Sequence, residues 1–338
     1  MAENMTVYGD ISPRTAVYAA RELLERAEPL LVFEKWGQAK PIPKNTARTI
    51  KFRRYEALDA TPNPLTEGVT PSGKKPTFTD VEATLQQYGD FVEITDVIQD
   101  LHEDPILREM MALTGEQAAQ MYEKVRYGVL CGGTNVFYPG VAAGRENVAA
   151  PLTIGLQRKI TAALMRQNAQ RITSMVGAGP NFNTTPIAPA YIAVCHVDLD
   201  TTLRKMAGFV PVEKYSNPSV AVPGEIGSVE GVRYIGTTMA EPFEDAGGAA
   251  EGFMSTGGSK ANVYPVLYFA KNAYGLVPLK GKAAVTPCVL NPNKPRGGDP
   301  LGQRGTVGWK GYTTAVILNE LFMAPCGSGC FYRLRKLI

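Results

Sequence analysis

Residues 46–55 read TARTIKFRRY, and residues 77–94 read TFTDVEATLQQYGDFVEI. The first run is rich in the Thr, Ile, Phe and Tyr residues that strands favour. In the second run, Val81, Ala83 and Leu85 alternate with polar residues, which is the period of a half-buried strand. Between the runs, residues 56–76 carry four prolines and two glycines, which predicts an irregular tip. Together these segments predict a long hairpin-like arm.

The predicted arm has no core of its own and needs another surface, because an isolated two-stranded hairpin is only marginally stable in water. That surface is either the arm's own domain, as for an ordinary edge hairpin, or a neighbouring copy. The second case would indicate an assembly protein rather than an enzyme. The cations Lys51, Arg53 and Arg54 lie on the first strand. We expect them to contact the acidic surface of a neighbour.

Composition describes an ordinary globular protein of more than one lobe. The chain has 338 residues, of which 44% are hydrophobic and 20% are charged, and its formal net charge is +3. This balance does not favour strong nucleic-acid binding, and the basic end with Arg333, Arg335 and Lys336 is interpreted as a solvated or strand-edge tail. The N-terminus lacks the pattern of a signal peptide, and no apolar run approaches the length of a membrane span. The five cysteines are expected to be reduced thiols.

Three helices are predicted. Ser12 and Pro13 mark the start of a short N-terminal helix. Asp104 and Pro105 start a second helix that runs to Cys131, about 25 residues or 37 Å, which we expect to form a spine. Its predicted apolar stripe consists of Leu107, Met111, Ala118, Met121, Val125 and Val129. A third helix is expected over residues 153–172, with Leu156, Ile160 and Leu164 on one face.

The second half of the chain predicts a mixed α/β lobe with long loops. Residues 188–199 read APAYIAVCHVDL, a buried strand that leads into a short helix. The candidate metal or catalytic cluster here is Cys195, His196, Asp198 and Asp200. Strand alternation would scatter these ligands over two faces, so a structural role is favoured, with Asp198 or Asp200 capping the next helix.

Motifs for catalysis and cofactor binding are absent from the sequence. Cys326 and Cys330 lack a second pair of zinc ligands and are interpreted as part of a turn. No phosphate-binding loop, dinucleotide fingerprint or nucleophile elbow occurs. We therefore predict no catalytic residues, no metal and no cofactor, and an enzyme is disfavoured.

A resemblance to a known family rests on residues 299–320, which read DPLGQRGTVGWKGYTTAVILNE. They resemble the C-terminal signature of a family of tailed-bacteriophage major capsid proteins. Residues 224–243, GEIGSVEGVRYIGTTMAEPF, are similar to the same family's glycine-glutamate segment and the strand after it. The arm, the spine helix and YIAVCHVDL follow in the family's order.

The resemblance implies an α+β fold of the Hong-Kong-phage type, shared by tailed phages and herpesviruses. Its parts map onto an N-terminal arm (1–38), a region including the extended E-loop (39–97), a P-domain with the spine helix (98–188), an A-domain (189–284) and a return to the P-domain (285–338).

The implied function is that of the major capsid protein of an icosahedral phage head, assembled as hexamers and pentamers around double-stranded DNA. The alternatives are a minor or decoration protein of the virion and, third, an enzyme with an unrecognised site.

The implied partners are other copies, a separate scaffolding protein, a portal, possible decoration proteins and non-specifically bound DNA. Assembly is expected in the host bacterial cytoplasm, and no membrane is implied. DNA contacts are expected to be weak and to involve Arg14, Arg21 and Arg26. Lys74 and Lys75 are candidates for the covalent cross-link that some relatives form.

Overall fold

The computed structural model describes residues 31–43, 45, 47–65, 67–97, 106–177, 183–217, 221–250, 252–279, 285–293, 295 and 297–331. The predicted N-terminal helix at Ser12 and Pro13 lies outside these residues, as do its cations Arg14, Arg21 and Arg26. The start of the spine helix at Asp104 and Pro105 and the basic tail with Arg333, Arg335 and Lys336 also lie outside them.

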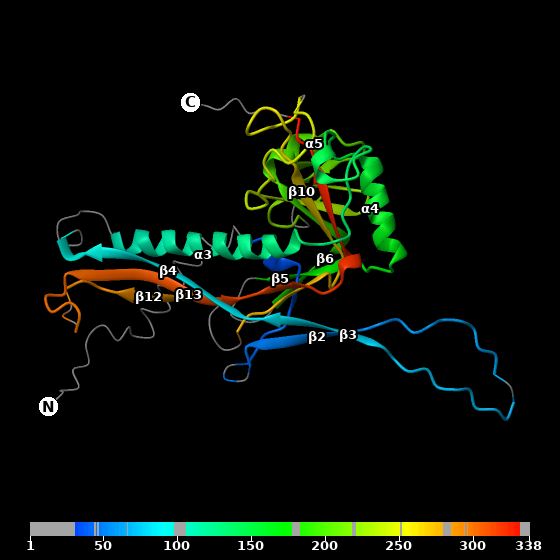
Figure 1. The fold of residues 1–338 in the computed structure, drawn as a ribbon, viewed down its shortest axis with the longest axis horizontal. Coiled ribbons are helices and arrows are strands. Elements are labelled where there is room, and N and C mark those ends of the chain that lie inside the picture. The colour runs from blue at the N-terminus through cyan, green and yellow to red at the C-terminus, as the bar shows by residue number, and fades with distance from the viewer. Residues whose placement is uncertain are drawn as a thin grey trace.

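The molecule is flat and branched (Figure 1). An elongated lower lobe extends to one side, an upright lobe rises from its end, and a thin arm extends to the other side. The described residues form four sheets, and the lower and upright lobes each contain one of them. A small third sheet joins the lobes, and the fourth is the arm.

The upright lobe is built on a seven-stranded sheet in the order β15-β10-β6-β9-β8-β7, with β5 pairing β6. Its central strand β6 is buried on both faces, because Tyr191, Ala193 and Cys195 pack into one core and Ile192 and Val194 into another. The elements of this lobe are β5 (Ile172–Gly177), β6 (Asn183–His196), β7 (Val210–Pro211), β8 (Glu225–Val229), β9 (Val232–Thr237), β10 (Tyr264–Phe269), β15 (Met323–Ser328), α4 (Ile154–Arg166), α5 (Asp200–Arg204), and the 3₁₀ turns Arg145–Asn147, Val197–Leu199, Val212–Lys214 and Glu320–Phe322.

Helix α4 covers one face of this sheet. Thr153 caps it by accepting a hydrogen bond from the amide of Leu156, and the predicted stripe of Leu156, Ile160 and Leu164 is buried. The predicted end at residue 172 is wrong. The helix stops at Arg166, because Asn168 adopts the left-handed conformation (φ 54°) and turns the chain into β5.

The lower lobe is the spine helix α3 (Ile106–Leu130) packed on a sheet of β12 (Val285–Leu290), β13 (Arg304–Thr313) and β4 (Gln86–Thr95). The predicted length of this helix is confirmed. Its predicted stripe is only partly right, since Ala118 is buried but the other described members lie at the edge of the contact. Tyr122 instead packs edge-on against Trp309 of β13, with ring centroids 5.8 Å apart. The helix therefore turns its small and aromatic residues toward the sheet.

A three-stranded sheet connects the lobes. In it β1 (Gln38–Ala39) runs parallel to β11 (Tyr274–Leu276), which pairs antiparallel with β14 (Ala315–Ile317). The segment before β1 includes a 3₁₀ turn at Phe33–Lys35, which packs against the end of α3 and the second core of the upright lobe.

The prediction that both runs of the arm form one hairpin is wrong for half of the second run. β2 (Thr49–Tyr55) pairs with β3 (Phe78–Thr84), but the chain leaves the arm at Leu85. The remainder forms β4, which pairs along its whole length with β13 in the lower lobe. The alternation of Val81, Ala83 and Leu85 ends between the two strands, but alternation indicates which face a side chain is on and not which strand lies alongside, so it could not identify the change of partner.

Candidate assembly interface

The base of the arm is a hairpin with two different faces. One face carries four cross-strand pairs: Thr49 with Thr84, Lys51 with Glu82, Arg53 with Asp80, and Tyr55 with Phe78. The hydroxyl oxygens of the first pair lie 3.5 Å apart, and the rings of the last meet edge-on with centroids 6.3 Å apart. Such directly opposed pairs stabilise antiparallel strands.

The cations predicted to contact a neighbour have partners within their own chain. Lys51 Nζ lies 2.6 Å from a carboxylate oxygen of Glu82. Arg53 donates to both carboxylate oxygens of Asp80, at 2.8 and 2.9 Å, and lowers the pKa of that carboxyl below its ordinary value. Arg54 reaches back to the carbonyl of Leu318 at 3.5 Å. The arm's own acids therefore neutralise two of the three cations.

The opposite face of the hairpin docks on the chain's own body, so the expectation that the arm lacks a core is wrong for its base. Phe52, Ala83 and Leu85 are buried in an apolar cluster with residues from the connecting sheet and its neighbours. Its other members are Ile42, Ile50, Val81, Val277, Leu279, Tyr312, Val316 and Leu318. The packed base therefore fixes the direction in which the tip leaves the body.

The tip, residues 56–77, is irregular as predicted and projects beyond the body (Figure 1). It exposes large apolar side chains, with Leu65 74% and Val69 64% exposed. Lys74 bonds to Asp59 across the tip, at 3.5 Å from its carboxylate and closer to its carbonyl oxygen. Lys75 is exposed, and no ion pair joins it to another described residue. An exposed apolar tip on a hairpin base that is packed on the body is suited to contact another molecule.

A buried ionic cluster, which sequence reasoning missed, ties the N-terminal segment to the spine helix. Glu123 of α3 is fully buried and accepts the amides of Val32 and Phe33 at 3.1 and 3.0 Å. Arg126 bridges Glu123 at 3.1 Å and Glu34 at 3.2 Å. Burial raises the pKa of the Glu123 carboxyl. A Glu and an Arg spaced by three on the predicted helix, away from its predicted apolar stripe, were the available signal, but exposed helix pairs share that spacing.

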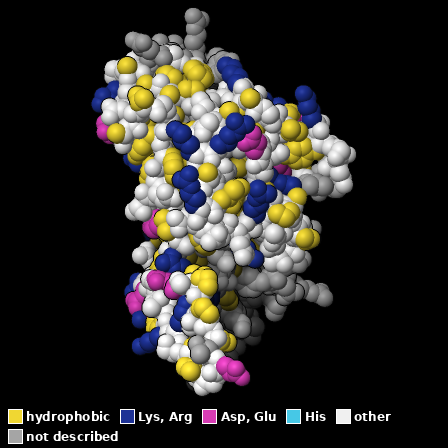
Figure 2. All heavy atoms as spheres, turned by 90° about the vertical axis from the view of Figure 1, so that its right-hand side faces the viewer, with side chains coloured by type: hydrophobic (Ala, Val, Ile, Leu, Met, Phe, Trp, Pro, Cys, Tyr) yellow, Lys and Arg dark blue, Asp and Glu magenta, His cyan; other side chains and the backbone are white. Residues whose placement is uncertain are grey.

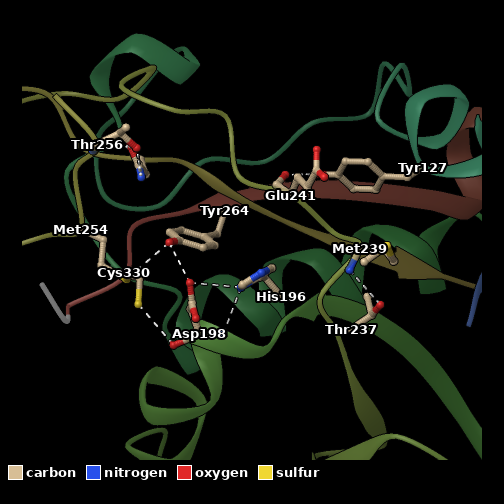
Figure 3. A network of polar contacts seen from close by, with 11 residues as sticks. Tyr127, His196, Asp198, Thr237, Met239, Glu241, Met254, Thr256, Tyr264 and Cys330 are labelled. Carbon is tan, nitrogen blue, oxygen red and sulfur yellow. Dashed lines mark hydrogen bonds and ion pairs between the residues drawn. The ribbon is translucent and has the colours of Figure 1, made fainter. Parts of the chain in front are cut away.

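The residues of the candidate cluster at the end of β6 form hydrogen bonds that hold neighbouring segments of the upright lobe together (Figure 3). Asp198 lies between His196 and Tyr264, accepting the Tyr264 hydroxyl at 3.0 Å, and Cys330 Sγ contacts the Asp198 carbonyl at 3.3 Å. The predicted capping by Asp198 or Asp200 is wrong. His196 caps the turn by accepting the amide of Asp198, while Asp200 begins α5 and pairs with Arg204.

The predicted turn at Cys326 and Cys330 is also wrong, because Cys326 lies within strand β15 and pairs with Val266. Its small neighbours Gly327 and Ser328 are buried strand residues beside β10, a tertiary setting that local composition could not reveal. Burial raises the pKa of both the Cys195 and Cys326 thiols to about 12. In the part of the chain that the structure describes, no three metal-ligating side chains come together.

Within the same described residues, no helix combines the length and the apolar character needed to cross a bilayer. One hollow of the surface lies beside Glu34, Tyr122 and Arg126, where the connecting sheet meets α3. The features that stand out for interaction are therefore surfaces, namely the arm, the spine and the rim of the upright lobe.

The sequence matches the family described as "Phage capsid protein" over residues 78–324. The chain therefore belongs to the phage capsid protein family. The predicted function, a major capsid protein of a phage head and a structural component of the virion, is confirmed at that level. None of the curated proteins compared with the chain matches it.

Solved capsid structures share the fold. The capsid of Ralstonia phage GP4 superposes with a TM-score of 0.64 at 12% identity, covering 89% of this chain and 88% of that one. The head protein of Helicobacter pylori bacteriophage KHP40 gives 0.58 at 10% identity, covering 86% and 87%. The capsid of cyanophage Pam1 gives 0.56 at 14% identity, covering 90% and 92%. The predicted Hong-Kong-phage-type fold is thus confirmed.

Proposed function

We propose that this capsid protein assembles with copies of itself, as hexamers and pentamers, into an icosahedral shell around double-stranded DNA. The observation that carries the proposal is the arm. Its base is fixed to the body by the cluster around Phe52, while its tip exposes Leu58, Leu65 and Val69 away from any core of the described chain. Burying that apolar surface on a neighbour would be favourable, at about 25 cal/mol per Å².

The proposed parts follow the branched shape. The arm tip belongs to the E-loop within residues 39–97. Helix α3 with β12 and β13 belongs to the P-domain (98–188 and 285–338), and the strands of the upright lobe from β6 to β10 belong mainly to the A-domain (189–284). Residues 1–38 form the N-terminal arm. The pairing of β13 with β12 on one side and with β4 on the other supports a rigid P-domain sheet that also holds the end of the 39–97 region.

The protein is proposed to act through assembly and not through catalysis, in line with a family of structural proteins. A separate scaffolding protein would guide the shell in the host cytoplasm, and a portal and decoration proteins would complete it. DNA contact would be weak and independent of sequence, because 35 Lys and Arg residues are nearly balanced by 32 Asp and Glu residues. Lys51, Arg53, Arg54, Lys74 and Lys75 remain candidates for contacts between subunits.

Electron microscopy of the purified chain tests the proposal, comparing the wild type with a variant in which residues 57–75 are replaced by a short Gly-Ser turn. We expect shells or sheets of hexamers from the wild type and folded, unassembled subunits from the variant. Circular dichroism of the variant controls for folding. Assembly that does not need the tip would contradict the role of the arm.

A wild-type chain that only binds to shells preformed from another protein would instead identify a decoration protein. A gel-shift titration with unrelated DNA duplexes at physiological salt completes the test. Tight binding, or a clear preference among the duplexes, would contradict weak and non-specific contact with DNA.

A further inference from the structure

The exposed side of α4 carries a concentration of positive charge that the balanced composition conceals. Arg158, Lys159 and Arg166 are exposed on this helix, which contains no acidic residue. Arg171 follows the helix, and Lys271 is brought beside it by the hydrogen bond from its amide to the Gln170 carbonyl, at 2.9 Å. We call these five residues the α4 basic face.

One acidic residue lies within this face. Glu230 and Gly231 form the turn between β8 and β9, both with positive φ, and the turn lies between Arg158 and Arg171. Arg158 pairs with Glu230 at 2.6 Å. Five cations and one anion are therefore gathered on one side of a chain whose total charge is only +3.

Helix stability does not explain this charge. Arg158 and Lys159 lie in the first half of α4, where cations gain nothing from the helix dipole, and their neighbours three and four positions away are uncharged. Lys159 and Arg166, seven residues apart, lie on one line of the helix surface. Neither has an ion pair with another described residue.

The position of the α4 basic face indicates its partner. Figure 1 looks down the shortest axis of a flat molecule and places α4 at the edge of the upright lobe. Figure 2 views that edge directly and shows Lys and Arg side chains gathered over the upper part with few acidic ones. In a shell of flat subunits, the edges meet neighbouring copies and the broad faces meet the interior and exterior.

A candidate partner surface lies on the other side of the same lobe. The loop Met239–Ala250, on the opposite side of the sheet from α4 in Figure 1, contains Glu241, Glu244 and Asp245 and no Lys or Arg. We call it the acidic loop. Lys124 pairs with Glu241 at 2.8 Å, and Arg145 and Lys260 border the loop. Glu244 is exposed without an ion pair to any described residue.

The acidic loop is held in shape by its own contacts. The Asp245 carboxylate accepts the amide of Gly257 at 2.8 Å and the hydroxyl of Ser255 at 3.0 Å, and the Gly248 amide bonds to the Val148 carbonyl at 2.9 Å. These bonds to Asp245 leave Glu241 and Glu244 on the exposed side of the loop. The loop is therefore a preformed surface for a cationic partner.

We propose that the α4 basic face of one copy docks on the acidic loop of the next, a head-to-tail contact that closes the upright lobes into a ring. The inference rests on the proposed function. Because the two surfaces differ and lie on opposite sides of one lobe, repeated contacts form closed rings when the rotation between copies permits. Charge complementarity would also select the correct neighbour during assembly.

Charge reversal on each surface tests the proposal. The first variant is Lys159→Glu with Arg166→Glu, and the second is Glu241→Lys with Glu244→Lys. We expect each purified variant to remain folded by circular dichroism but to form at least tenfold fewer rings or shells than the wild type. The matched control, Lys159→Gln with Arg166→Gln, should be intermediate and less sensitive to salt.

Mixing the two variants gives the sharpest readout. At the substituted positions, unlike copies carry opposite charges and like copies carry the same charge, so an equimolar mixture should restore rings in which the variants alternate. Alternation closes a ring of six but not a ring of five, so hexamers should return without the pentamers that close a shell. A single chain carrying all four substitutions should restore both.

The possible outcomes separate this inference from the proposed function. Absence of shells from the wild type would count against the proposed function itself. Normal shells from the first variant would overturn the inference, and normal shells that have lost bound DNA would assign the α4 basic face to DNA instead. Loss of assembly that neither the mixture nor the fourfold variant restores would exclude the acidic loop as the partner.

Discussion

The carboxylate of Glu123, in the C-terminal part of the spine helix, accepts the backbone amide of Phe33 at 3.0 Å, although the two residues lie 90 positions apart in the chain. The same carboxylate accepts the Val32 amide and pairs with Arg126. One side chain thus fixes where the N-terminal segment leaves the body. The Glu123 carboxylate is fully buried, so water cannot replace its hydrogen bonds and its ion pair if the side chain is removed.

Replacing Glu123 by Ala should destabilise the subunit by about 3–5 kcal/mol, because it leaves Arg126 buried with a weaker partner and two amides without acceptors. Urea unfolding measures the change. The exposed Glu109→Ala on the same helix is the control and should cost less than about 0.5 kcal/mol. Equal midpoints for the two variants would show that the cluster contributes nothing to stability.

The tip of the arm should exchange its amide hydrogens rapidly in the free subunit and slowly in the shell. Residues 56–77 form no strand, whereas β2 and β3 are paired along seven positions. Hydrogen exchange of residues 46–94 in both states measures this. Strong and equal protection of the tip in the free subunit and the shell would refute the contact between copies.

Replacing Phe52 by Ala should release the base of the arm from the body. Phe52 is only 5% exposed, and such truncations cost about 3–5 kcal/mol. We expect β2 and β3 to lose hydrogen-exchange protection while the upright lobe keeps it. Tyr55→Ala, on the exposed face of the same strand, serves as the control. Unchanged protection of β2 would mean that cross-strand pairing is enough to hold the arm.

Replacing both Arg53 and Arg54 by Glu should impair assembly more than folding. Exposed ion pairs contribute only about 0–1 kcal/mol each, but the same contact recurs at every subunit of a shell. Sedimentation measures assembly, and urea unfolding measures folding. The swap Arg53→Asp with Asp80→Arg preserves the pair within the hairpin and separates its role from contacts with neighbours. Normal shells from the Arg53→Glu, Arg54→Glu variant would show that these residues serve only the hairpin.

Native subunits at pH 8 should be alkylated by iodoacetamide mainly at Cys288. This thiol is exposed, whereas burial raises the pKa of Cys131 to about 11 and that of Cys195 and Cys326 to about 12, which keeps them as unreactive thiols. Mass spectrometry locates the label, and Cys288→Ser should abolish it in the native protein. Rapid native labelling of Cys195 would mean that the central sheet opens readily.

Local patterns were sufficient for the elements whose signals lie within a few residues. The spine helix, the α4 stripe of Leu156, Ile160 and Leu164, and the buried strand around Val194 follow from periodicity and capping. The proline-rich tip follows from composition. The family followed from one specific string, residues 299–320, which forms β13, β14 and the turn after them.

Partners across space were decided by the tertiary structure. The run of residues 77–94, with its alternation from Val81 to Gln86, predicted a strand of the arm, but only the fold sends β3 to the arm and β4 to the lower lobe, because side-chain period carries no information on which strand lies alongside. Sequence identified Arg53 as a cation, and the register set Asp80 opposite it. Burial of Glu123 and the gathering of Arg166, Arg171 and Lys271 on one edge likewise depend on contacts between segments that are far apart in the chain. A local sequence pattern does not indicate such contacts.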